Sequence, residues 1–333
     1  MEAPAHIPSG VTHEAARADD SGAASSDSAI MARFLVKPGF LIARVDQIST
    51  VIYGGLSVGE TLAQAEFLLL LDALGTIPQI ALARAGGVDK STTAYVLNNL
   101  ETRGWVARTV CPDDRRRTLV SLTAGGAARV ARIRGDHDAL ERQLIQPIAV
   151  PERARLVAML HSLAANPAGP APLWVPACHP AVGVLDGATS FLWRRLLQLF
   201  QAQFLACTAG FHLTLRQFSL LFILTLRPSI TQVRFARMFG LDPSTCGVIM
   251  RGLVARGLVA HAPSPRDRRE RLYTITRQGR SVVTEVQPLV DRSERLVFRD
   301  EAAAGKRWLI RQLQAIVRAH SHRLRFPGAV SDI

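Results

Sequence analysis

The sequence has 333 residues, 48% of them hydrophobic, and a formal net charge of +13. This length fits about two globular domains, and the basic excess favours an anionic partner such as nucleic acid. The longest apolar runs, at residues 67–71 and 218–226, are much shorter than the ~20 residues that cross a bilayer, so we expect no membrane partner.

The N-terminal segment predicts little folded structure. Residues 1–30 are rich in Ala, Ser, Gly and Asp and hold few large apolar side chains, which is typical of a disordered tail. They also lack a basic leader followed by an apolar core, so we expect no signal peptide and a cytoplasmic location.

A first domain is predicted over residues 31–166. Apolar side chains recur at helical spacing, and β-type alternation surrounds a polar turn. In chain order the elements are helices over residues 34–52, 63–74 and 79–84, a capped helix from Asp89 to Gly104, strands over 105–109 and around Leu119, and helices over 124–146 and 151–163.

The helix that begins at Asp89 is the most clearly defined element. The Asp89 carboxylate can accept hydrogen bonds from the free N–H groups of the first turn. The side chains from Thr93 to Leu100 that lie at i, i+3, i+4 and i+7 form one buried stripe. The opposite face is polar, and Gly104 stands where helices commonly end.

A proline-rich linker is predicted at residues 167–180, followed by a second domain at 181–326 and a tail at 327–333. The second domain repeats the first: Asp242-Pro243-Ser244-Thr245 and Asp267-Arg268-Arg269 lie 153 residues after their counterparts. Its elements are helices over 182–207, 215–226 and 231–237, a helix from Asp242 to Gly257, strands over 258–261 and 272–275, and helices over 277–297 and 302–323.

The two copies differ in length by two residues. Phe67 and Phe218 are 151 residues apart, whereas Asp89 and Asp242 are 153 apart. We interpret this as a two-residue insertion between these two points of the second copy.

Helix, turn, capped helix and basic hairpin together predict a winged helix-turn-helix. The fold class is therefore mainly α with small β-hairpin wings, as two such domains on a helical core. An α-helix fits a DNA major groove, and a basic loop beside it can enter the minor groove or hold phosphates. This arrangement predicts double-stranded DNA as the partner.

The order of elements, the run from Asp89 to Gly104 and the wing Pro112-Asp113-Asp114-Arg115-Arg116 resemble the MarR family of bacterial transcriptional regulators. The resemblance covers most of residues 31–325. It implies homodimers whose first and last helices interlock, roughly palindromic operators, and release of DNA when a small, often aromatic, acid binds between the dimer core and the winged domain. A sequence-specific regulator, with repression as the expected mode, follows from it.

The resemblance also implies residue roles. Arg115 and Arg268 correspond to wing arginines that enter the minor groove, and Asp114 and Asp267 would support the wings. The full predicted DNA-binding set is Lys90, Ser91, Thr92, Tyr95, Asn98, Arg115, Arg116, Arg117, Ser244, Thr245, Arg251, Arg266, Arg268 and Arg269.

Fusion of two copies departs from the family pattern. We expect one chain to supply both halves of the dimer, as a monomeric pseudo-dimer; two fused chains pairing into a four-winged assembly is the alternative. The reading surfaces are unequal, since Tyr95 becomes Val248 and Asn98 becomes Arg251. An imperfect palindrome with half-sites about one helical turn apart is therefore predicted.

An effector pocket is less clearly indicated. Side chains that fit an anionic aromatic ligand near the expected dimer core are Arg44, Tyr53, Trp193, Arg194 and His212. Ordinary packing or surface positions remain the alternative for each of them.

Other functions have weaker support. An architectural DNA-binding protein without sequence preference is the main alternative, and it would bind every sequence with the same steep salt dependence. We expect no enzyme, cofactor or metal, because the motifs for them are missing. Four cysteines without CxxC spacing indicate reduced thiols, with oxidant sensing by Cys111 or Cys207 left open.

Overall fold

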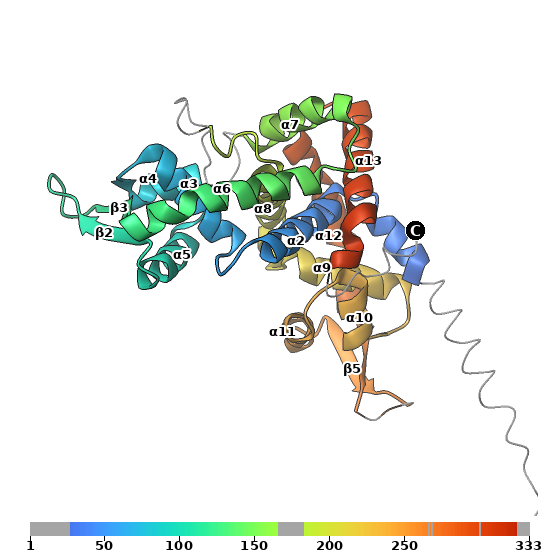
Figure 1. Cartoon of the computed structure of the whole chain (residues 1–333). Coiled ribbons are helices and arrows are strands. Elements are labelled where there is room, and N and C mark those ends of the chain that lie inside the picture. Colours follow the sequence, from blue (N-terminus) through green and yellow to red (C-terminus); the bar gives the residue numbers. More distant parts are fainter. Residues whose placement is uncertain (1–26, 166–182, 266, 268, 300, 325–333) are drawn as a thin grey trace, which may run out of the picture.

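In the computed structural model a helical core carries two winged lobes (Figure 1). The structure describes residues 27–165, 183–265, 267, 269–299 and 301–324. The predicted linker at 167–180 and the predicted tail at 327–333 lie outside these residues. Across the described ranges, no helix combines the length and apolarity needed to traverse a bilayer.

Each half of the chain repeats one order of elements. The first half contains α2 (Pro38–Leu56), α3 (Leu62–Leu74), β1 (Ile77–Pro78), α4 (Gln79–Ala85), α5 (Lys90–Thr102), β2 (Val106–Val110), β3 (Thr118–Leu122), α6 (Ala124–Leu144) and α7 (Val150–Ala164). The second contains α8 (Thr189–Cys207), η1 (Ala209–Phe211), α9 (Leu215–Leu226), β4 (Ile230–Thr231), α10 (Gln232–Phe239), α11 (Pro243–Ala255), β5 (Val259–Pro263), β6 (Arg271–Ile275), α12 (Arg277–Phe298), α13 (Ala303–His320) and η2 (Ser321–Arg323).

The core is built from both halves. α2 packs against α8, the last helix of the first half (α7) packs on α8, and the last helix of the second half (α13) packs on α2. One hydrophobic cluster accordingly joins Leu41 and Ile48 of α2 to Leu196 and Leu199 of α8 and Leu313 of α13. The first and last helices therefore interlock within a single chain.

Each lobe ends in a three-stranded antiparallel sheet. In the first lobe Val106 pairs with Leu122 and Val110 with Thr118, while β1 adds a third strand through Ile77 opposite Val120. The second lobe has the same order, β4-β6-β5. The two-residue strands β1 and β4 were not predicted, because two residues are too few to show an alternating pattern.

Two glycines explain how each closing helix leaves its sheet. A Cβ on Gly126 of α6 would lie 2.0 Å from the carbonyl oxygen of Trp105, and one on Gly279 of α12 would lie 2.2 Å from that of Leu258. No side chain fits at either distance. The repeated glycine therefore allows the helix to cross closely over the residue directly before β2 or β5.

Some predicted boundaries are wrong. Residues 27–34 form a short helix, so Phe34 does not start the long helix and the described part of the predicted 1–30 tail is ordered. Because Pro38 favours the first turn of a helix, α2 begins there. The second long helix, predicted from Val182, begins at Thr189.

The two-residue insertion also lies elsewhere than predicted. Thr61 and Gln64 form a capping box before α3, and Thr214 and Gln217 form the equivalent box before α9, already 153 residues later. The extra residues therefore lie in the loop between α8 and α9, which contains η1. The counterpart of Phe67 is therefore Leu220. The prediction paired Phe67 with Phe218 because both are phenylalanines.

Candidate DNA interface and effector pocket

The first recognition helix, α5, is capped as its sequence predicts. Asp89 accepts hydrogen bonds from the backbone N–H groups of Ser91 and Thr92, both at 2.9 Å, and from their hydroxyl groups at 2.5 and 2.7 Å. These bonds lower the pKa of the Asp89 carboxyl to about 2. Thr93 and Leu100 face the core, so the opposite side of the helix points outward.

Both recognition helices present their predicted reading faces to solvent. On α5 the exposed residues are Lys90, Ser91, Thr92, Tyr95 and Asn98; on α11, Ser244, Val248 and Arg251 are exposed and Thr245 is half-buried. Tyr95 is 71% exposed and its counterpart Val248 is 62% exposed. Apolar and aromatic side chains exposed to this degree are available for contact with bases, and they differ between the two helices.

The first wing is an arginine-rich turn organised by one aspartate. Asp114 accepts a hydrogen bond from the backbone N–H of Arg116 at 3.0 Å and forms an ion pair with Arg117 at 3.2 Å. The side chains of Arg115, Arg116 and Arg117 are exposed. The turn therefore displays positive charge while Asp114 fixes its shape.

The second wing has the same turn, and the structure describes fewer of its arginines. Asp267 accepts a hydrogen bond from the backbone N–H of Arg269 at 2.8 Å, and Arg269 is exposed. Arg266 and Arg268 lie outside the described residues. Glu270 stands where the first wing has Arg117, so this wing lacks that arginine's contribution.

The two lobes are arranged so that both recognition helices lie on one side of the molecule. In Figure 1, α5 and α11 both lie toward the lower left, and the hairpins extend away from them at the two ends. In the same view the helical core lies to the right of the first lobe and above the second. A single duplex running along this side could meet both recognition helices.

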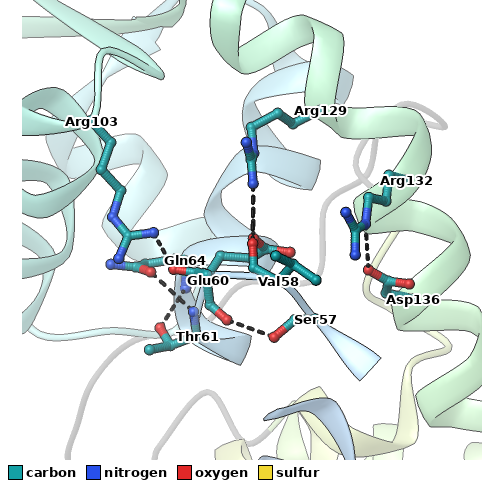
Figure 2. A network of polar contacts seen from close by, with 10 residues as sticks. Ser57, Val58, Glu60, Thr61, Gln64, Arg103, Arg129, Arg132 and Asp136 are labelled. Atoms are coloured by element: carbon teal, nitrogen blue, oxygen red, sulfur yellow. Dashed lines mark hydrogen bonds and ion pairs between the residues drawn. The ribbon is translucent and has the colours of Figure 1, made fainter. Parts of the chain in front are cut away.

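Arginines connect the first recognition helix to the core, as Figure 2 shows. Arg103, which ends α5, donates to the carbonyl of Gly59 in the loop between α2 and α3. Arg129 of α6 donates to the carbonyl of Val58 at 3.2 Å and contacts Glu60 at 3.5 Å. The position of α5 thus depends on the same loop that holds α6.

The second lobe keeps only part of this connection. Arg256, the counterpart of Arg103, donates to the carbonyls of His212 at 2.8 Å and Phe211 at 2.6 Å. The counterpart of Arg129 is Val282. The second lobe therefore lacks the link that Arg129 makes from α6 in the first.

A cavity of about 480 Å³ lies where the core meets the second lobe. Its wall comes from α2, α8, α9, α10 and α12. Aromatic side chains dominate the lining and cationic groups surround them; the aromatic residues are Phe34, Phe40, Phe200, Phe204, Phe218, Phe222 and Phe239, and the cationic residues are Arg33, Lys37, Arg44 and Arg216. The arrangement suits a ligand with an apolar body and a negative group.

Of the five predicted effector residues, only Arg44 lines this cavity. Its burial lowers the pKa of the guanidinium to about 10, and it lies 5.9 Å from the centre of the Phe40 ring. Tyr53 and Trp193 are fully buried in the core, and Arg194 pairs with Glu66. His212 is exposed and contributes its carbonyl to Arg256 instead.

Sequence reasoning missed most of the cavity. Phe40, Phe222 and Phe239 come from three separate helices, and nothing in their spacing links them. One available signal was composition, because eight of the thirteen phenylalanines fall within residues 191–239.

Burial makes one of the described cysteines less reactive. Cys246 is buried on the inner stripe of α11, and this burial raises the pKa of its thiol to about 11. Cys111 and Cys207 are partly buried. Cys178 lies outside the described residues.

In a comparison with known proteins, a segment of each half matches a protein family. Residues 61–118 and residues 212–270 each match the MarR family. An HTH-type transcriptional regulator of Bacillus subtilis, YdgJ, is 28% identical over 108 residues, covering 32% of this chain and 66% of that protein. The multiple antibiotic resistance protein MarR of Escherichia coli is 37% identical over 68 residues, covering 20% of this chain and 47% of that protein.

A solved structure of a probable transcriptional regulator from Pseudomonas aeruginosa is also similar. It shares 30% sequence identity with this chain, with a TM-score of 0.37, and the match covers 38% of this chain and 96% of that one. The chain spans between about half and two thirds of the length of the curated relatives it matches.

Proposed function

Because the chain belongs to the MarR family and carries two of its domains in tandem, we propose that it is a sequence-specific transcriptional regulator of the cytoplasm. One chain supplies both recognition helices. The observation that carries the proposal is the placement of α5 and α11 on one side of a shared core, each next to a hairpin (Figure 1). Repression by occupying an operator is the expected mode of action.

The operator is an imperfect palindrome. α5 offers Tyr95 and Asn98 where α11 offers Val248 and Arg251, so the two helices favour different bases. Their half-sites lie about one helical turn apart, as for other paired recognition helices.

Selection of bound genomic fragments tests this proposal. The selected sites should contain two unlike half-sites, and making both halves identical should weaken binding. Random DNA should compete poorly with the selected site. Equal competition by random DNA would favour the architectural alternative, in which phosphate contacts supply the affinity.

The wings add affinity through exposed arginines. We expect Arg115→Ala to weaken operator binding by about 1–3 kcal/mol, because a groove contact by arginine has that magnitude. Fluorescence anisotropy with a labelled operator measures the change. Arg153→Ala, far from the wing on α7, is the control, and an equal loss in both variants would contradict a specific role for the wing.

An aromatic carboxylate is the proposed effector. The phenylalanine-lined cavity supports this class, since its aromatic wall can stack on a ring and Arg44 and Arg216 can neutralise a carboxylate. Because α9 and α10 belong to the second lobe, a ligand between them and the core can change the lobe's position. Adding a panel of aromatic acids to the preformed operator complex should identify one that releases the DNA.

A further inference from the structure

The two halves can be compared position by position at the cavity. α2 and α8 begin at Pro38 and Thr189, a separation of 151 residues, and α3 and α9 begin at Leu62 and Leu215, a separation of 153. With these offsets, the cavity-lining Ala43 corresponds to Arg194, and the cavity-lining Ser219 corresponds to Glu66.

These two residues fill the equivalent position in the first half. The guanidinium of Arg194 on α8 donates to the carboxylate of Glu66 on α3 in a close ion pair. The Glu66 side chain is 1% exposed and that of Arg194 is 19% exposed. Where the second half keeps two small side chains and open space, the first half holds a buried, charged pair.

The surroundings differ in the same direction. The cavity-lining Phe204 corresponds to Tyr53, and Val290 corresponds to His137, which is 4% exposed. Arg216, on the cavity rim, corresponds to Ala63. The first half therefore has less aromatic surface at this position, and it has the buried Arg194–Glu66 ion pair where the second half has the rim cation Arg216.

We propose that the chain binds one apolar anion, in the cavity of the second half alone. This deepens the proposed function by fixing the stoichiometry and location of the effector. In the first half, the ligand's negative group would face the Glu66 carboxylate, and Arg194 is already neutralised by that same carboxylate. In the second half, Arg33, Arg44 and Arg216 line the cavity, and the Glu294 carboxylate that also lines it is paired with Lys306.

One-sided binding makes regulation one-sided. The ligand touches the core helices α2 and α8 and the second-lobe helices α9 and α10, but no recognition or wing element of the first lobe. The first lobe keeps its connection through Arg103 and Arg129. Ligand binding thus loosens the contact with one half-site, and loss of one half-site suffices to lower affinity for the whole operator.

The test uses 1-anilinonaphthalene-8-sulfonate, an apolar aromatic anion whose fluorescence rises in apolar sites, and the full chain without DNA. We expect saturation at one probe per chain. Transplanting the charged pair, as Ala43→Arg with Ser219→Glu, should weaken probe binding at least tenfold. The reciprocal variant, Glu66→Ser with Arg194→Ala, is the matched control and should keep the second-half site at its original affinity.

Three results would overturn the proposal: two probes bound to each unmodified chain, unchanged probe affinity in the transplanted variant, or lost probe binding in the matched control. Arg216→Ala, at an exposed rim position, provides a second variant that does not depend on repacking; it should weaken probe binding about tenfold, as expected for one charge-assisted hydrogen bond. Operator binding by the probe-free chain is measured separately, so failure of the one-site inference remains distinguishable from failure of DNA recognition.

Discussion

At the scale of single residues, aspartates determine local geometry in both halves. Asp89 and Asp242 begin the recognition helices, and Asp114 and Asp267 shape the wings. The two helix caps were predicted from residue type and position, because a short carboxylate next to free N–H groups has few other arrangements. The roles of Asp114 and Asp267 in the wings were expected from the family resemblance.

Removal of a cap should destabilise the first lobe. Asp89→Ala leaves the N–H groups of Ser91 and Thr92 without their acceptor, and we expect a loss of about 1 kcal/mol in the free energy of unfolding. Urea denaturation measures it. Asp89→Asn, which preserves an acceptor oxygen, should lose less than the alanine variant; an equal loss would show that capping is not the cause.

Asp46 predicts a pH dependence of stability. Burial raises the pKa of its carboxyl from 3.8 to about 6, opposed by Arg194 and Arg216 and reinforced by Glu66. Because the folded-state pKa is raised, the folded protein binds this proton more tightly than the unfolded chain does. The contribution of this bound proton to the free energy of unfolding is complete below pH 3.8 and is lost as the pH rises through about 6.

Asp46→Asn should therefore stabilise the protein at pH 7.5, by about 1–3 kcal/mol, and leave it unchanged near pH 4. Unfolding free energies measured at both pH values check the difference. The exposed Asp138→Asn is the control and should show no such dependence. Stabilisation of equal size at both pH values would contradict ionisation of Asp46 as the cause.

At the scale of elements, helices with repeated apolar spacing were predictable and contacts between helices were not. The recognition helices, hairpins and closing helices follow from periodicity and caps. The helix at residues 27–34 did not, because its apolar side chains match surfaces of the second half: Phe34 packs on Phe222 and Phe239, with ring centres 5.8 and 5.0 Å away. Asp27 likewise pairs with Arg227 and Arg234.

The close approach of α6 to Trp105, directly before β2, provides a test at this scale. Gly126→Ala would place a methyl group 2.0 Å from the carbonyl oxygen of Trp105, so we expect a loss of about 2–3 kcal/mol in unfolding free energy. Gly135→Ala, also on α6 but with open space around it, should be neutral or stabilising by up to about 1 kcal/mol. Thermal unfolding compares the two, and similar effects would contradict the proposed close approach.

At the scale of the whole molecule, the duplication predicted two domains, and the structure joins them through one core. Interlocking of α7 with α8 and of α13 with α2 was expected from the family resemblance. The aromatic cavity beside the second lobe was not expected. It depends on small differences between the halves, Ala43 against Arg194 and Ser219 against Glu66, whose significance appears only when the halves are superimposed on their shared elements.

The central claim is that one chain contains both recognition helices, which in a dimeric regulator come from two chains. Sedimentation of the chain with a duplex carrying one selected operator measures the number of chains per duplex most directly. We expect one chain per duplex across the saturation range. Two chains bound to each single operator, as in a four-winged assembly, would contradict the account.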